Sequence, residues 1–234
     1  MKIEALQEKV DRVIPAPPAL WAWAAMLGEA RTLSNDGRRG VRADRGAGNR
    51  DVDLLGAFSE LLLLGWASRL YPPLVIAEMA AHLYHPQGGR EVKGADLRLP
   101  NSATGLIVGV DAKSFDCSPR KRYFAINDAK HRALGGGCDH YFCVLAAPYG
   151  TQAAVARLVP YVEVEDWSVV GLRPGGTPSR NLEIGVFLRR YFSQPPAPQS
   201  LRSDCHSRDI VERLKRDPGC RARLCALIPS LPAG

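Results

Sequence analysis

The sequence has no apolar run long enough to cross a bilayer. A membrane-spanning helix needs roughly 20 apolar residues, and the run Leu61–Leu64 is far shorter. Residues 1–12 are charged and amphipathic, and they lack the continuous apolar segment of a secretory signal. We therefore expect a cytoplasmic protein that does not span a membrane.

Closely spaced cysteine pairs are also missing. No two of the six cysteines have the two-residue spacing of a zinc knuckle, and in a reducing compartment we expect free thiols. Cys205 and His206 with Cys220 and Cys225 could form a zinc site. The simpler interpretation is that Cys220 and Cys225 are ordinary small residues of a terminal helix.

Internal repeats and long low-complexity tracts are absent. The length of 234 residues fits one large domain, or one core with appended segments. Basic residues outnumber acidic ones by 31 to 24, which gives a net charge of +7 and a pI of about 9.3. A basic surplus favours a polyanionic partner, namely DNA, RNA or an acidic membrane surface.

The N-terminal part combines a helix with an arginine-rich loop. Apolar residues at helical spacing predict a helix over 17–33, with Pro17 and Pro18 at its start. Residues 34–50 are rich in Gly, Asn, Asp and Arg and predict a loop. Its arginines, Arg38 and Arg39 among them, fit two interpretations: a solvated loop, or an arm that folds onto a phosphate backbone.

The middle of the chain changes from helices to strands. A strongly apolar helix is predicted over 52–70, and Glu60 lies inside it, where a buried carboxylate without a partner is costly. Further elements are expected as follows: a helix over about 74–84, strands over 93–99, 105–115, 138–147 and 157–164, a helix from Ser118 to about Leu134, a proline-rich linker over 194–200 and a short charged helix over 208–216.

Asp111 and Lys113 end the second of these strands. Their two-residue spacing puts both side chains on one face of the strand. If the strands over 93–99 and 105–115 pair as a hairpin, Asp96 comes close to Asp111. Two adjacent carboxylates suit a hard divalent cation, and a neighbouring lysine can stabilise charge that develops on a phosphate. The pattern predicts metal-assisted phosphodiester hydrolysis.

This segment resembles the core of the PD-(D/E)XK nuclease superfamily over residues 52–165. Asp96 matches the first acid of the family motif, and Asp111-Ala112-Lys113 matches the second part. Glu60 matches the acidic residue that members often carry on the preceding helix. The residue before Asp96 is Ala95, where the family pattern has proline. The resemblance implies a restriction-endonuclease-like α/β fold with a central mixed sheet flanked by helices.

The resemblance also divides the chain and assigns site residues. It implies an N-terminal segment 1–50, a nuclease core 51–170 and a C-terminal extension 171–234. Asp96, Asp111 and Glu60 would bind Mg²⁺, with Mn²⁺ as a substitute, and Lys113 would complete the catalytic set. The expected substrate-binding residues are Asn127, Lys130, His131, Arg120, Arg122, Arg38 and Arg39. For Lys130 and for the Arg120–Arg122 cluster, a solvated helix surface is the competing interpretation.

The implied activity is a Mg²⁺-dependent endonuclease acting on DNA, with RNA as an open alternative. The family resemblance places such an enzyme in defence against foreign DNA, by restriction or as an antiphage or toxin effector. Two other interpretations are a repair or recombination nuclease, and a nucleic-acid-binding module with an inactive metal site. Cutting both strands with this fold usually requires two sites, so we expect a homodimer.

Overall fold

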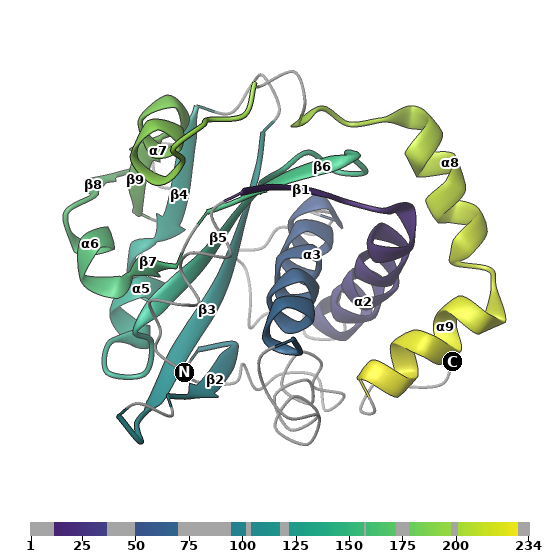
Figure 1. Cartoon of the computed structure of the whole chain (residues 1–234), viewed down its shortest axis with the longest axis horizontal. Helices are drawn as coiled ribbons and strands as arrows, with labels where there is room; N and C mark the ends of the chain where they lie inside the picture. Colours follow the sequence, from purple (N-terminus) through teal and green to yellow (C-terminus); the bar gives the residue numbers. More distant parts are fainter. Residues whose placement is uncertain are drawn as a thin grey trace.

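The computed structural model describes residues 12–36, 50–69, 95–101, 104–117, 122–156, 158–171, 178–197 and 201–228. Within these residues a six-stranded sheet has the order β1–β6–β5–β3–β2, with β7 paired to β5 (Figure 1). Its strands are β1 (Arg12–Pro15), β2 (Leu97–Pro100), β3 (Ile107–Asp116), β5 (His140–Ala146), β6 (Gln152–Val155) and β7 (Val159–Pro160). The pair β3–β5 is parallel and the other described pairs are antiparallel. The protein therefore has an α/β fold with a mixed central sheet.

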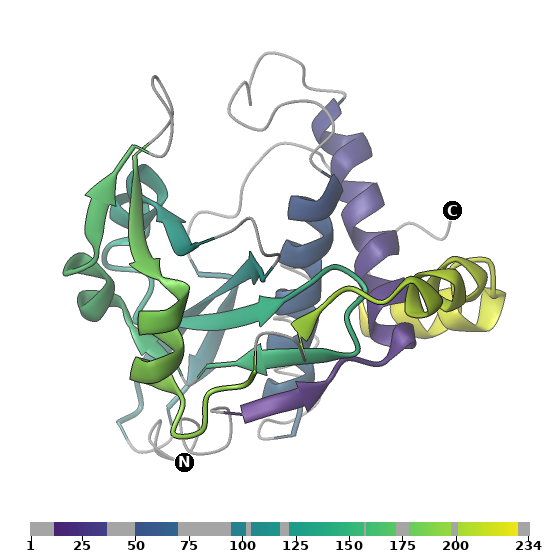
Figure 2. The ribbon, with the colours of Figure 1, turned by 90° about the horizontal axis from the view of Figure 1, so that it is seen from above.

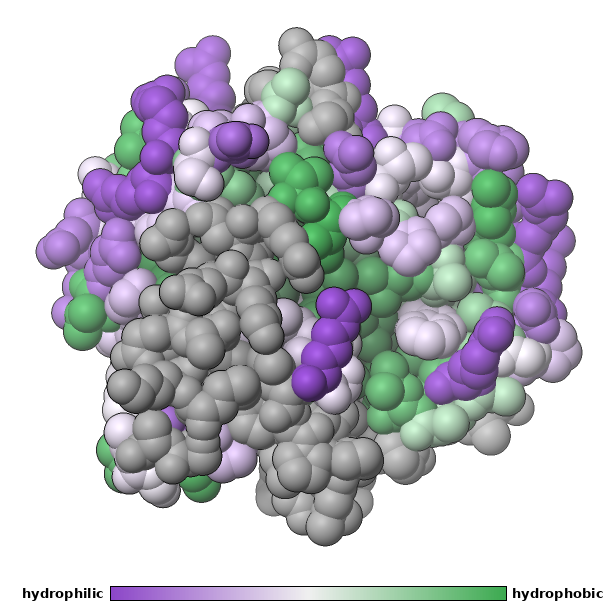
Figure 3. All heavy atoms as spheres, in the orientation of Figure 1, coloured by the Kyte–Doolittle hydropathy of each residue, from purple (hydrophilic) through white to green (hydrophobic). Residues whose placement is uncertain are grey.

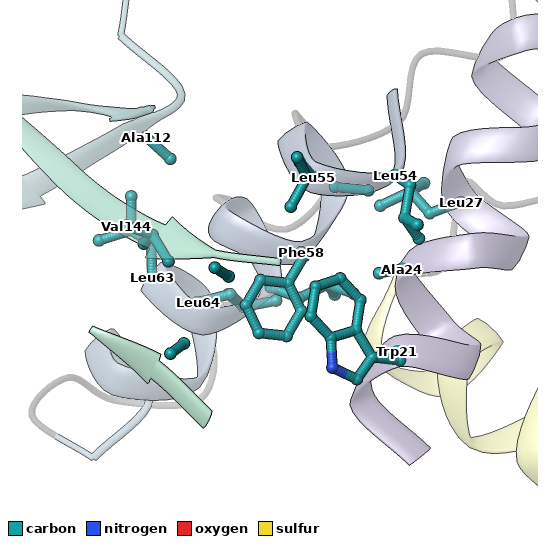
Figure 4. Packing of buried hydrophobic residues seen from close by; sticks show 14 of the residues in the cluster. Trp21, Ala24, Leu27, Leu54, Leu55, Phe58, Leu63, Leu64, Ala112 and Val144 are labelled. Atoms are coloured by element: carbon teal, nitrogen blue, oxygen red, sulfur yellow. The ribbon is translucent and has the colours of Figure 1, made fainter. Parts of the chain in front are cut away.

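Two long helices cover one face of this sheet. They are α2 (Pro18–Asp36) and α3 (Arg50–Ala67), and they confirm the helices expected over 17–33 and 52–70. Trp21 and Phe58 stack between them with ring centroids 3.8 Å apart (Figure 4). Their apolar side chains pack on Ala112 and Val144 of the sheet, so α3 lies directly against the strand that carries Asp111.

The C-terminal helices extend this helical layer. The helices α8 (Cys205–Leu214) and α9 (Pro218–Leu227) pack against α2, as the view from above also shows (Figure 2). Hydrophilic residues cover the solvent side of the region of α8 (Figure 3), while Ser207 and Val211 of this helix are buried. The charged helix expected over 208–216 begins earlier, because Asp204 caps the amide groups of His206 and Ser207. Within the described helices, none is both long and apolar enough to cross a bilayer.

A small antiparallel sheet and three short helices cover the other face. The sheet has the order β4–β9–β8 among the described residues, with β4 (Tyr123–Asn127), β8 (Ser168–Val170) and β9 (Ser179–Glu183). The helices are α5 (Asp128–Leu134), α6 (Tyr161–Glu165) and α7 (Ile184–Tyr191). Phe124 of β4 stacks on Phe187 of α7 with centroids 4.7 Å apart, and this second core packs on Tyr141, Cys143 and Leu145 of β5.

The helix expected from Ser118 to Leu134 is confirmed only in its C-terminal half, and it is wrong for the described residues before Asp128. Residues 123–127 form β4, and only Asp128–Leu134 are helical. Phe124 and Ile126 are buried while their neighbours are more exposed, which is the two-residue period of a strand. Good start and stop signals at the two ends concealed this alternation, and pairing with β9 fixes the strand.

The other strands, the helix and the loop expected from the sequence are confirmed, corrected or outside the described residues. The strands expected over 105–115 and 138–147 are confirmed by β3 and β5. Among the described residues, the strand expected around Asp96 spans Leu97–Pro100, and Asp96 itself precedes it. The strand expected over 157–164 is wrong at its C-terminal half, because α6 begins at Tyr161. The helix expected over 74–84 and most of the loop 34–50 lie outside the described residues.

Gly109 of β3 lets the turn after α5 approach the sheet. A Cβ atom on Gly109 would lie 2.2 Å from the carbonyl oxygen of Gly137 and 3.2 Å from the Cβ of Ala95. Asp139 closes the contact, since its side chain accepts from the Gly109 amide at 2.7 Å and its own amide donates to the Gly109 carbonyl at 2.8 Å. This contact fixes β3 against β5, two residues before Asp111.

The Gly109→Ala substitution should therefore lower the free energy of unfolding by about 1–3 kcal/mol, the usual cost of overpacking. Gly56→Ala is the matched control, because a Cβ there meets nothing within 4 Å and alanine is the better helix former. Urea denaturation of the three proteins measures the effect. Equal midpoints for wild type and Gly109→Ala would contradict the close approach.

Candidate functional site

The hairpin β2–β3 brings Asp96 to the middle of β3. The register pairs Leu97 with Val110, so Asp96, one residue before β2, lies across from Asp111. The Oδ2 of Asp96 accepts the backbone N–H of Ala112 at 2.7 Å. The Asp96 side chain thus adds a hydrogen bond to β3 just before β2 begins at Leu97. This arrangement confirms the expected approach of Asp96 to Asp111.

Asp111 and Lys113 point to the sheet face away from α3. Ala112, between them, belongs to the core under α3 (Figure 4), and side chains alternate along a strand. The Lys113 ammonium forms an ion pair with the carboxylate of Asp111. The Asp111 side chain is 6% exposed and that of Lys113 27% exposed. Solvent therefore reaches this pair mainly at Lys113.

Burial and charge shape the acidity of this pair. Burial raises the pKa of Asp111 to about 7, repulsion from Asp96 adds to the rise, and attraction to Lys113 opposes it. Burial alone would lower the pKa of Lys113, but the carboxylates of Asp111 and Asp96 outweigh it and the pKa is raised. Lys113 therefore stays positively charged. The ionised form of Asp111 is destabilised by burial and by Asp96, and a further cation would offset this destabilisation.

Glu60 of α3 is held by Arg31 of α2. Both oxygens of the Glu60 carboxylate accept hydrogen bonds from the Arg31 guanidinium. The two residues therefore form a bidentate ion pair between α2 and α3. Burial raises the pKa of Glu60, Arg31 opposes the rise, and the negative charge of Asp96 adds to it. The sequence left two places for Glu60, solvent or a charged site. The structure places it near Asp96 and gives it a partner that helical spacing alone does not reveal.

The donor set fits a hard divalent cation only in part. Among the described residues, no three His, Cys, Asp or Glu side chains are grouped so as to hold a metal ion. Asp96 and Asp111 offer carboxylate oxygens, and one or two carboxylates with retained waters are a usual protein contribution to Mg²⁺ binding. Glu60 is occupied by Arg31. The set that fits is thus Asp96 with Asp111, and Glu60 is a neighbour of the site.

The cysteines form no metal site in the described part of the chain. Cys220 is fully buried in the core and Cys205 is exposed. All six thiols are free, as the sequence predicted. Cys138 and Cys143 lie near Asp111 and Lys113, and burial raises the pKa of Cys138 to about 12, so this thiol is neutral at physiological pH.

Two expected substrate-binding residues at the start of α5 and within it, Asn127 and His131, have structural partners. The Oδ1 of Asn127 accepts the amide of Lys130 at 2.9 Å and so caps the helix. His131 is 1% exposed, and its ring contacts Tyr141 and Tyr161. In this arrangement His131 is too buried to reach a polymer outside the molecule, and the Oδ1 of half-buried Asn127 is used as the cap of α5. Lys130 is half-buried.

The arginines expected to bind substrate are placed only in part. Arg122 is exposed at the start of β4, and its carbonyl accepts the amide of Ile184 at 2.8 Å. Arg38, Arg39 and Arg120 lie outside the described residues. Arg122 therefore stays a candidate for contact with a polyanion.

Comparison of the chain with family models, with curated proteins and with solved structures gives no match. The assignment of a function to this site therefore depends on the arrangement of its own residues.

Proposed function

We propose that this protein is a Mg²⁺-dependent endonuclease of the PD-(D/E)XK type that hydrolyses DNA phosphodiester bonds. The observation that carries the proposal is the approach of Asp96 to Asp111 across β2–β3, with Lys113 on the same face of β3. The order helix, strand, strand, crossover and parallel strand around these residues supports it. The basic surplus of the whole chain is consistent with a polyanionic substrate.

The residues would divide the chemistry as follows. Asp96 and Asp111 would hold Mg²⁺, which when bound supplies a water of lowered pKa and polarises the phosphoryl oxygens. Lys113, with its raised pKa, would stay protonated and stabilise negative charge on the phosphate as the attacking oxygen adds. Asp96 is aimed by its hydrogen bond to the Ala112 amide, so its geometry is set before any ligand arrives. No covalent bond to the enzyme is required.

A nucleic-acid-binding module is the second candidate. The observation in its favour is that Lys113 and Arg31 already pair with Asp111 and Glu60, so two of the three carboxylates have cationic partners without a metal. A binding module would retain affinity for DNA but would not cut it. Repair and recombination nucleases share the proposed chemistry with defence nucleases, and we propose defence against foreign DNA on the family resemblance.

Incubation of supercoiled plasmid with the full chain tests the proposal. Nicked or linear product with Mg²⁺ or Mn²⁺, and none with EDTA, is the expected result. Sequencing of the cut ends then reports specificity, and gel filtration with and without DNA tests the proposed homodimer. No cleavage of DNA or RNA with either metal would reject the enzyme and leave the binding module.

The arginine-rich loop provides a separate prediction about binding. Changing Arg38 and Arg39 to alanine should weaken DNA binding and reduce the log–log salt slope by about 0.9 for each lost phosphate contact. Fluorescence anisotropy at several salt concentrations measures the slope. Arg213→Ala, which removes an exposed arginine of α8, is the comparison variant. An unchanged salt slope in the double variant would show that Arg38 and Arg39 make no phosphate contacts.

A further inference from the structure

A buried aromatic network connects the candidate site to α5 and α6. Tyr141 of β5 pairs in register with Asp111 of β3, and parallel partners point to the same face of the sheet. The Tyr141 ring is 0% exposed and lies under the Lys113 ammonium, 5.9 Å from Nζ to the ring centroid. This distance is within the range of a cation–π interaction. The Lys113 ammonium therefore contacts the Asp111 carboxylate and the Tyr141 ring, and it also donates to the Ala112 carbonyl at 3.4 Å.

His131 fixes the orientation of Tyr141. Its Nδ1 and the Tyr141 hydroxyl are 2.8 Å apart and share a hydrogen bond. The Tyr161 ring stacks on the His131 ring with centroids 4.1 Å apart, and the Tyr161 hydroxyl donates to the His131 carbonyl at 2.8 Å. The imidazole is therefore held between two tyrosines from different elements, and it cannot rotate without breaking the hydrogen bond to Tyr141.

The network of Tyr141, His131 and Tyr161 holds its rings in fixed orientations and carries no positive charge. Burial, together with the positive charge of Arg180, lowers the pKa of His131, so the ring is neutral at physiological pH. Its Nε2 is buried and has no hydrogen-bond partner among the described residues. Burial also raises the pKa of the Tyr141 hydroxyl, which stays protonated. Neither group is exposed to a polymer, so neither is placed to touch a substrate.

We propose that Tyr141 is a positioning residue for Lys113, and that His131 acts through Tyr141 by holding its ring beneath the ammonium. The inference deepens the proposed nuclease function and rests on it for its effect on catalysis. A lysine has four flexible bonds, and an ion pair with Asp111 alone leaves the ammonium free to swing about that carboxylate. The Tyr141 ring limits this movement and keeps the Lys113 ammonium at the solvent-accessible side of the Asp111–Lys113 pair.

NMR of the full chain labelled with ¹³C in its lysine side chains tests the contact without any cleavage assay. The Lys113 Hε protons should show an upfield ring-current shift in wild type. Tyr141→Leu should remove the shift, Tyr141→Phe should retain most of it, and His131→Phe should change it. Tyr191→Phe is the matched control, because Tyr191 is buried in the same core and its hydroxyl donates to Glu163 at 2.8 Å, away from Lys113.

Steady-state cleavage kinetics test the consequence. Tyr141→Leu should lower kcat by about 2- to 30-fold, the range of a cation–π interaction, with KM nearly unchanged. Tyr141→Phe and His131→Phe should each lower kcat less, and the double variant should fall no further than the larger single effect, because both remove the same hydrogen bond. Tyr191→Phe should leave kcat within about 2-fold at a matched fraction of folded protein.

The outcomes separate the two proposals. A Lys113 shift that Tyr141→Leu leaves unchanged overturns the positioning role, whatever the protein cuts. A shift that behaves as expected in a protein that cuts no nucleic acid rejects the nuclease while the contact stands. Independent, multiplying effects of Tyr141→Phe and His131→Phe on kcat would reject the part played by His131.

Discussion

Replacing Asp111 by alanine is expected to lower Mg²⁺-dependent cleavage by about 100- to 1,000-fold or more, the scale seen when a group that acts on transition-state charge is removed. Asp111 is the buried member of the acidic pair and the partner of Lys113. Its loss removes one of the two carboxylates that fit the cation and frees the lysine from its fixed place. The initial rate of plasmid nicking measures the effect.

The same variant separates an enzyme from a binding module. Asp209→Ala is the control, because Asp209 is an exposed aspartate of α8 in the layer beyond α2. Added Mg²⁺ should raise the melting temperature of wild type and of Asp209→Ala, since a ligand that binds only the folded state stabilises it. Asp111→Ala should show little rise. Equal cleavage by Asp111→Ala and wild type would remove this residue from the site.

Without a metal, ionisation of Asp111 is expected to destabilise the protein. Burial and repulsion from Asp96 raise the pKa of Asp111 to about 7 in the folded state, compared with 3.8 for an ordinary aspartate. The folded state therefore holds the proton more tightly than the unfolded state. The stability from this proton is fully present below pH 3.8 and is lost as the pH rises through about 7.

Asp111→Asn carries a neutral group at every pH, and it is the reference for this contribution. In EDTA, wild type should lose on the order of 2 kcal/mol relative to the variant between pH 5 and pH 8. That corresponds to roughly 4–8 °C in melting temperature for a chain of this size. Saturating Mg²⁺ should reverse the loss in wild type alone. Parallel pH curves for the two proteins in EDTA would show that Asp111 does not titrate in this range.

The candidate site was partly visible in the sequence because some of its geometry is local. The two-residue spacing of Asp111 and Lys113 puts them on one face of any strand, whatever surrounds it. The hairpin with Asp96 follows from two strands separated by a short turn. Glu60 attracted attention because a carboxylate inside an apolar helix needs a partner. The partner itself, Arg31, is 29 residues away and belongs to another helix.

Tertiary contacts explain where the structure differs from what the sequence suggests. Residues 123–127 were assigned to a helix because the signals at its two ends were strong, yet β9, more than 50 residues later, pairs with this segment and makes it a strand. The family resemblance predicts that His131, on the helix after the motif strand, contacts substrate. Packing between Tyr141 and Tyr161 buries it, and that arrangement depends on α5, β5 and α6 together.

By itself, the sequence determined what short-range periodicity and burial cost can determine. It placed the helices α2 and α3, the strands β3 and β5, and the shared face of Asp111 and Lys113. Only the tertiary structure decided which partner each buried carboxylate has: Arg31 pairs with Glu60, Lys113 pairs with Asp111, and the Ala112 amide donates a hydrogen bond to Asp96. The physical reason is that pairing between buried charges depends on distances of a few ångströms, and these are set when separate helices and strands pack together.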